Sequence, residues 1–222
     1  MNRSGKTERG ETPLSILSNA PPAEPSRAEV RKNQVLEAAT ECFRQQGFHG
    51  TSMAQISKTA GMSVGHIYHY FENKEAIIAA IVERDLLNLI TITDRIRGME
   101  GDVFSAMVAD VDACITDTVD DANAPLMLEV VAEAARNPAV ANIVRKADRE
   151  AMAHMRAFIR EGLKQYGLSK TDEELDGPLS MMAAMFEGLT VRMIRNPDLT
   201  AERYAPVIRS LMQHIIQQHL IK

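Results

Sequence analysis

Residues 51–71 decide the fold, and they read TSMAQISKTAGMSVGHIYHYF. The Thr-Ser pair at the start can cap a helix whose apolar side chains, including Ile56, recur on one face. Gly61 permits the left-handed backbone that a tight turn requires. Ser63 then caps a second, very short helix that ends near Phe71. The stretch therefore predicts a helix, a glycine turn and a second helix.

The second helix carries small or hydrogen-bonding side chains, which suit a helix that enters the major groove of DNA. These residues are Ser63, Gly65, His66, Tyr68, His69 and Tyr70. Gly65 lets the backbone approach the bases, His66 can reach a base edge, and tyrosine hydroxyls can hold phosphates. Lys74 begins the next helix, where its charge and the helix amides favour phosphate. For His66 taken alone, an ordinary solvent-facing histidine is the alternative interpretation.

Apolar residues recur at helical spacing on both sides of this stretch. The expected helices cover residues 27–46, 52–61, 63–71, 73 to beyond 86, 102–115, 125–135, 138–166, about 173–195 and 200–222. Gly177-Pro178 is a point at which the eighth of these helices could start late. Nine helices and no convincing strand predict an all-α protein. Only 5% of residues are aromatic, with no Trp, which also disfavours a sandwich or barrel.

Charge is divided unevenly along the chain, although the total is −5. Residues 1–26, with the run Ala-Pro-Pro-Ala-Glu-Pro, predict a flexible tail. Residues 27–74 hold six Lys or Arg and four Asp or Glu, whereas residues 75–222 hold 16 and 23. A mildly basic segment beside a larger acidic one suggests separate partners for the two parts.

The composition excludes several classes of protein. Cys42 and Cys114 are the only cysteines, so neither a disulfide framework nor a thiolate zinc site is expected. The N-terminus lacks the apolar core of a signal peptide, and no stretch has the roughly 18 apolar residues that span a bilayer. We therefore expect a cytoplasmic protein without a membrane partner.

The chain resembles the TetR family of transcriptional repressors between Gln34 and Glu83. The matching motifs are Ala38-Ala-x-x-x-Phe43, Gly47-Phe-x-x-Thr-Ser-Met-x-x-Ile56, Ala60-Gly-Met-Ser-Val-Gly65 and Ile67-Tyr-His-Tyr-Phe71-x-x-Lys74-Glu. The resemblance covers about a quarter of the chain and is far more specific than a lone helix-turn-helix. It implies a three-helix DNA-binding head at 27–74 and a six-helix ligand-binding and dimerisation body at 75–222.

The family's DNA contacts carry over position by position. Base-facing positions fall on Val64, Gly65 and His66. Phosphate-contacting positions fall on Thr51, Ser52, Tyr68, His69, Tyr70 and Lys74. Simple periodicity would bury Val64 and Tyr68 with Ile67 and Phe71, but the family match turns both outward. Many members have Lys or another polar residue where Val64 stands, so we expect Val64 to touch a thymine methyl rather than guanine.

Ten of the 13 methionines lie in residues 75–222, and flexible Met side chains suit a pocket that accepts varied ligands. An ordinary helical core or dimer seam is the alternative. The expected pocket walls are Phe104, Met107, Met127, Phe158 and Met185. Glu129 and Glu133 lie one turn apart on an otherwise apolar segment and could select a cationic effector. Alternatively, Glu133 pairs with Arg136, or both glutamates lie on a solvated edge.

Family resemblance implies a homodimer in which helices near 178–195 and 201–218 form a four-helix bundle. The expected contacts, each of which could equally be intrachain core, are Met181, Met185, Leu189, Ile208, Leu211 and Ile215. A two-fold dimer presents two heads to DNA, so the operator is expected to be near-palindromic double-stranded DNA. A cationic or amphipathic small-molecule effector that prefers another head spacing would release it.

The sequence leaves two other functions to consider: an all-helical metal protein or enzyme, and a DNA-binding regulator without an effector. A di-iron bundle needs Glu-x-x-His pairs, but the chain has Glu150-x-x-x-His154, once and at the wrong spacing. The phosphate-loop, nucleophile-elbow and dinucleotide motifs are absent, so no enzyme, cofactor or metal is expected. A DNA-binding regulator without an effector stays open, because an apolar core and an apolar pocket look alike in sequence.

Overall fold

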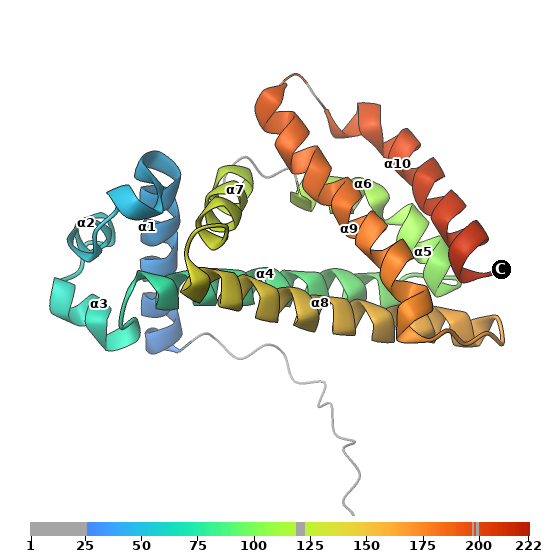
Figure 1. Ribbon diagram of the computed structural model, residues 1–222, viewed down its shortest axis with the longest axis horizontal. Helices are drawn as coiled ribbons and strands as arrows, with labels where there is room; N and C mark the ends of the chain where they lie inside the picture. The colour runs from blue at the N-terminus through green and yellow to red at the C-terminus, as the bar shows by residue number, and fades with distance from the viewer. Residues whose placement is uncertain (1–25, 119–122, 197, 199) are drawn as a thin grey trace, which may run out of the picture.

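The computed structural model describes residues 26–118, 123–196, 198 and 200–222. The described part is helical and contains no strand, so the predicted all-α class is confirmed (Figure 1). The helices are α1 (Arg27–Gly50), α2 (Met53–Thr59), α3 (Val64–Tyr70), α4 (Lys74–Arg97), α5 (Val103–Ala109), α6 (Val111–Thr118), α7 (Asn123–Ala134), α8 (Pro138–Gln165), α9 (Asp172–Arg195), α10 (Ala201–Ile215) and a π-helical turn, η1 (Ile216–Leu220). Apart from Ser26, the tail predicted at 1–26 lies outside the described residues.

Helices α1, α2 and α3 form the head, and local sequence signals set their ends. Ser26 and Glu29 make a capping box that begins α1, as their spacing indicates. Gly47 has φ +71° and interrupts α1, where the sequence predicted its end. Ser52 caps α2, and Gly61, with φ +63°, makes the turn into α3. The predicted helix-turn-helix is therefore confirmed.

A hydrophobic cluster holds the head together and extends beyond it. Helices α1, α2 and α3 contribute Phe43, Ile56 and Ile67, each at most 2% exposed. The first turns of α4 add a row of isoleucines, and α7 adds Leu126 and Val130. Val140 of α8 also belongs to this cluster, so the head packs onto three helices of the remaining chain, which we call the body.

Helices α4 and α8 lie side by side and run from the head to the far end of the body (Figure 1). Helices α9 and α10 cover that far end together with α5 and α6. A second hydrophobic cluster fills the space between them, with Phe104, Phe158 and Leu163 among its members. Figure 1 also shows α7 standing between α1 and α9, so that α7 faces the head on one side and the body on the other.

One boundary differs from the sequence expectation, and one alternative is decided. The helix predicted at 102–115 turns at Asp110, so that it becomes α5 and α6. The carboxylate of Asp110 is 6% exposed and accepts bonds from Arg95 of α4, which fixes the chain at this turn. Pro178 does not delay α9, because a capping box of Thr171 and Glu174 begins that helix one turn and a half earlier.

Candidate nucleic-acid interface and effector hollow

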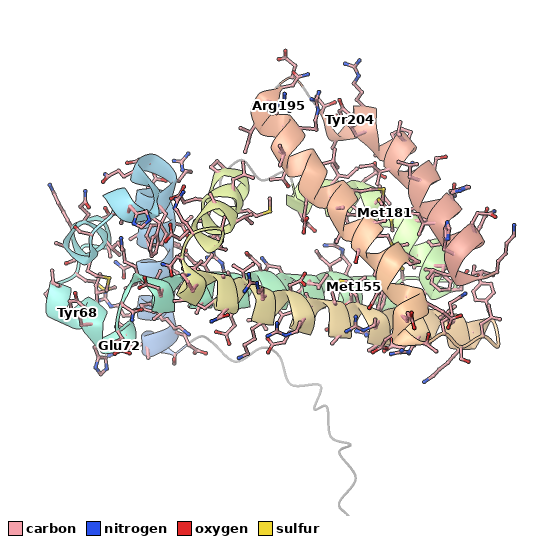
Figure 2. The ribbon with its side chains drawn as sticks, viewed as in Figure 1. Tyr68, Glu72, Met155, Met181, Arg195 and Tyr204 are labelled. Atoms are coloured by element: carbon pink, nitrogen blue, oxygen red, sulfur yellow. The ribbon has the colours of Figure 1, made fainter. Side chains whose placement is uncertain are left out.

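Helix α3 turns one face into the head and the other outward. Ile67 and Phe71 are buried, at 0% and 4% exposure, while Val64 is 39% and Tyr68 is 52% exposed. Figure 2 shows Tyr68 at the outer edge of the head. The expectation that Val64 and Tyr68 point outward, against simple periodicity, is confirmed.

The exposed face of α3 carries a preformed group of rings. His66 and Tyr70 are stacked, with ring centroids 5.4 Å apart, and His66 Nε2 lies 3.4 Å from Tyr70 Oη. His69 meets the edge of Tyr70 at 5.3 Å. A Cβ at Gly65 would have no heavy atom within 4 Å, so the face is open at this point. Stacking restrains rings that would otherwise rotate freely, which reduces the entropy cost of contacting a ligand.

Ser52 and Ser63 lie exposed at the starts of α2 and α3. Each hydroxyl oxygen accepts a backbone N–H from three residues on, at 3.2 Å. The hydroxyl hydrogens remain available to donate, which is what a phosphate oxygen requires. Both side chains therefore lie at the surface that their predicted role needs.

Two predicted phosphate contacts are turned inward, and the structure contradicts them as side-chain contacts. Thr51 is 2% exposed, and its hydroxyl lies 3.0 Å from the carbonyl oxygen of Cys42 and 2.9 Å from that of Gly47. The ammonium group of Lys74 donates to the carbonyl oxygens of Phe48 and Thr51, the latter at 2.8 Å. It also lies 4.3 Å from the centre of the Phe48 ring. These groups brace the turn between α1 and α2.

The body contains an open cavity of about 730 Å³, which we call the hollow. Aliphatic side chains make most of its wall: Ile81, Leu86 and Leu89 of α4, Leu126, Met127 and Val131 of α7, Val144 of α8 and Val191 of α9. Of the predicted pocket walls, Met127 lines the hollow. A volume of this size suits a small organic ligand rather than a single ion.

Within the part of the chain that the structure describes, four carboxylates line the hollow, and sequence reasoning missed all four. They are Asp85 of α4, Asp117 of α6, Asp148 of α8 and Glu187 of α9. Burial raises the pKa of Asp85, and the nearby charge of Arg84 opposes this only in part. Asp117 accepts a 3.0 Å bond from Arg95, while Asp148 and Glu187 are exposed. A signal did exist for Asp85, which stands at helical spacing from Ile81 and Leu89, on an apolar face.

The other predicted pocket residues are wrong as walls of this hollow. Phe104, Met107 and Phe158 are at most 5% exposed inside the second hydrophobic cluster, and Met185 packs against it. Phe104 fits against Gly162, and Arg97 lies over the ring of Phe158 at 5.1 Å. Apolar residues at helical spacing are found both in a packed core and in the wall of a cavity. Spacing alone therefore did not distinguish core residues from residues that line the hollow.

Glu129 and Glu133 also do not line the hollow. The side chain of Glu133 is fully buried, with His49 Nε2 at 3.0 Å, Arg136 Nε at 3.0 Å and Asn137 Nδ2 at 2.9 Å. Burial alone would raise the pKa of Glu133, but the bonds from Asn137 and Arg136 and the charge of His49 outweigh it and lower that pKa. The cationic interpretation of this pair is wrong, and the alternative pairing of Glu133 with Arg136 is confirmed.

Helices α9 and α10 present apolar side chains that the other described residues leave uncovered. The exposed fractions are 58% for Met181, 45% for Ile194, 57% for Val207 and 47% for Leu211. Of the other predicted dimer contacts, Leu189, Ile208 and Ile215 are buried within the chain and Met185 is half-buried, as the core alternative requires.

The described residues meet neither the requirements of a metal site nor those of a membrane-spanning helix. Among them, no three His, Cys, Asp or Glu side chains lie close enough together to hold a metal ion. Across the described helices, none has a stretch long and apolar enough to cross a membrane.

Comparison with known families places the chain. Residues 35–81 match the family described as bacterial regulatory proteins, tetR family. Residues 105–217, half of the chain, match the C-terminal part of the BetI-type transcriptional repressors. The chain belongs to the TetR family. Members of this family are transcriptional regulators and not enzymes, and the predicted family and class are therefore confirmed.

Individual TetR-family relatives share between 16% and 34% of their residues with this chain over the matched parts. The regulator UidR of Escherichia coli K12 is 34% identical over 121 residues, which span 54% of this chain and 60% of UidR. The regulator BetI of Escherichia coli O17:K52:H18 is 25% identical over 86% of this chain and 94% of BetI. The structure of FadR from Bacillus subtilis in complex with stearoyl-CoA shares the fold, with a TM-score of 0.66 and 16% identity over 81% of this chain and 96% of FadR.

Proposed function

We propose that this TetR-family regulator is a homodimeric repressor that a cationic, partly apolar small molecule releases from a near-palindromic operator. The single observation that supports DNA recognition most strongly is the outward face of α3. Its six residues from Val64 to His69 include one buried side chain, Ile67, and five exposed positions. A short helix that is anchored by one residue and open elsewhere suits insertion into the major groove.

Within this proposal each exposed residue has a role that its chemistry supports. Val64 and the open backbone at Gly65 approach a thymine methyl, and His66 approaches a base edge. Tyr68, His69, Tyr70, Ser52 and Ser63 donate to phosphates. Thr51 and Lys74 support these contacts indirectly, because they hold the turn that precedes α2.

The homodimer rests on the uncovered apolar side chains of α9 and α10. Met181 and Leu211 keep the role that the sequence gave them, and Val207, one turn before Leu211 on α10, adds a third exposed apolar side chain. Two such surfaces related by a two-fold axis make an isologous interface. Two heads placed about 34 Å apart would reach successive major grooves on one side of DNA in the cytoplasm.

The effector proposal rests on the hollow. The FadR structure shows that a protein of this fold holds a ligand as large as stearoyl-CoA. Here the wall carries four carboxylates, which favour a cation over an acyl-CoA anion. None of the lining side chains within the described residues is aromatic, so a quaternary ammonium group would find no ring among them on which to stack. We therefore favour a cation with N–H donors and an aliphatic part.

Selection of operator DNA from a random duplex library, at fixed moderate salt, tests the function. The natural chain is expected to recover a palindrome, and Tyr68→Ala, which removes a 52% exposed side chain, is expected to bind that palindrome more weakly with its fold intact. Leu87→Ala removes a similarly exposed side chain from α4, outside the head, and serves as the matched control. Recovery of no motif, or equal binding by Tyr68→Ala, would overturn the proposal.

A further inference from the structure

Helix α7 touches both functional parts of the molecule. Leu126 and Val130 belong to the hydrophobic cluster of the head, where they lie with Val35 and Phe43 of α1. The same two side chains also line the hollow, beside Met127 and Leu128 of the same helix. A change in the wall of the hollow at α7 is therefore also a change at the surface on which the head rests.

Polar contacts tie α7 to one short segment of the head, the turn formed by Gly47, Phe48 and His49. The backbone N–H of Phe48 donates to Oε1 of Glu129 at 2.5 Å. The same carboxyl lies against Gly47, where a Cβ would come within 3.0 Å of Oε1. One helical turn further along α7, Glu133 holds the ring of His49 at 3.0 Å. Two carboxylates of the body thus grip two consecutive residues of the head.

The gripped turn leads directly into the helix-turn-helix. Gly47, with φ +71°, ends the regular part of α1, and Ser52 begins α2 only five residues later. Lys74, from the first turn of α4, closes the turn from the opposite side through the carbonyl oxygens of Phe48 and Thr51. The orientation of α2 and α3 is thereby set from two helices of the body, α4 and α7.

We propose that α7 is the lever through which occupancy of the hollow moves the head, with Glu129 and Glu133 as the positioning residues that grip the turn at 47–49. A ligand that enters the hollow pushes against Met127 and its apolar neighbours and displaces α7. The two glutamates carry that displacement to the turn, and α3 is re-aimed. This inference rests on the proposed function for its biological meaning, but its geometry can be tested without DNA or effector.

The experiment measures the distance between the head and the body. Spin labels are attached at Lys58→Cys in α2 and Ala153→Cys in α8, both exposed, and each labelled chain is diluted with unlabelled chain. The native cysteines label slowly, because Cys42 is buried and burial raises the pKa of the Cys114 thiol to about 12. Met127→Trp fills part of the hollow and stands in for a ligand, and Val131→Trp, at a 53% exposed lining position, is a second filler should the first not fold.

The lever predicts a defined pattern of distances. Either filler shifts the distance distribution when residue 129 is Glu. Glu129→Ala removes the acceptor for Phe48 N–H, so the distribution broadens and the shift caused by the filler is lost. Glu129→Gln keeps a side-chain oxygen at the same place and is expected to restore both the narrow distribution and the shift. A merely structural role for Glu129 would change thermal unfolding without this rescue of the shift.

Two outcomes would overturn the inference. The first is that both fillers leave the distribution unchanged in the natural background, since the hollow would then have no mechanical link to the head. The second is that the shift persists in Glu129→Ala, since Glu129 would then not carry the displacement to the turn. Neither outcome bears on whether the protein recovers an operator, so failure of the lever and failure of the proposed function are distinguishable.

Discussion

The head and the body hold their functional residues in different ways. In the head, the residues that face DNA in our proposal lie within the seven-residue helix α3 and the two serines that cap α2 and α3, a stretch of 19 residues from Ser52 to Tyr70. In the body, the hollow is assembled from α4, α6, α7, α8 and α9, whose contributions lie more than 100 residues apart in the chain. A local sequence motif therefore describes the first site and cannot describe the second.

The largest expected effect concerns the proposed dimer surface of the body, to which α9 and α10 both contribute exposed apolar side chains. Leu211→Glu places a charge on the neighbouring α10 at a 47% exposed position. Two such carboxylates, unpaired at a two-fold interface, are expected to cost about 3 kcal/mol or more of dimer stability. Sedimentation should show a folded monomer with weak operator binding. Leu87→Glu, at 56% exposure on α4, should stay dimeric; a Leu211→Glu dimer would refute the interface.

The contrast between the two hydrophobic clusters can be sharpened by Ile67→Ala. Ile67 is fully buried in the head, and its truncation is expected to cost about 2–5 kcal/mol. Amide exchange in α1 to α3 should accelerate more than exchange near Phe158 and Leu163 in the body. Val64→Ala, on the exposed side of α3, should leave stability nearly unchanged. Equal acceleration in both clusters would show that head and body unfold as one unit.

Charge in the hollow is tested by Asp148→Asn. An exposed carboxylate a few Å from a bound ammonium group contributes about 1 kcal/mol, so octylammonium should bind roughly fivefold more weakly to the variant. Neutral 1-octanol is the matched ligand and should bind the two proteins equally. Calorimetric titration measures both. An equal loss for the alcohol would mean that Asp148 shapes the hollow rather than selecting its charge.

The smallest effect concerns stability against pH at Asp85. Burial raises the pKa of Asp85 in the folded chain, so its charged form opposes folding above that raised pKa, and the penalty vanishes as the pH falls through it. Asp85→Asn should therefore be slightly more stable than the natural chain at pH 7. The gain should stay below about 1 kcal/mol, because neighbouring side chains shield the Asp85 carboxyl only in part and solvent still reaches the residue. The two melting curves should converge in acid. A constant difference at every pH would contradict this.

The head was largely predictable because its signals are local. Capping residues such as Ser52 and Ser63 and the positive-φ glycines Gly47 and Gly61 act within a few residues, so spacing along the chain reveals them. What spacing did not reveal is the direction of Thr51 and Lys74. Both are polar and both lie near the start of a helix, but the backbone carbonyls that hold them, such as those of Cys42 and Phe48, come from residues 9 to 26 positions earlier in the chain.

The body was predictable as helices but not as a site. Phe158 and Met127 look alike in sequence, and only the packing of α4 against α8 decides which one meets the hollow. Glu133 looked like a charge in an apolar cavity, because its partner His49 lies 84 residues earlier and nothing in the local pattern points to it. Asp148 was missed because it is one charged residue among several on α8, whereas Asp85 could have been found from its place between Ile81 and Leu89 on an apolar face.

The central claim is that the body controls the head, and one titration tests it most directly. Affinity of the selected operator is measured with and without saturating octylammonium, and affinity of octylammonium is measured with and without saturating operator. The account requires each ligand to weaken the other by the same factor, because the coupling free energy is shared. Independent binding of the two, or no binding of the cation, would contradict it.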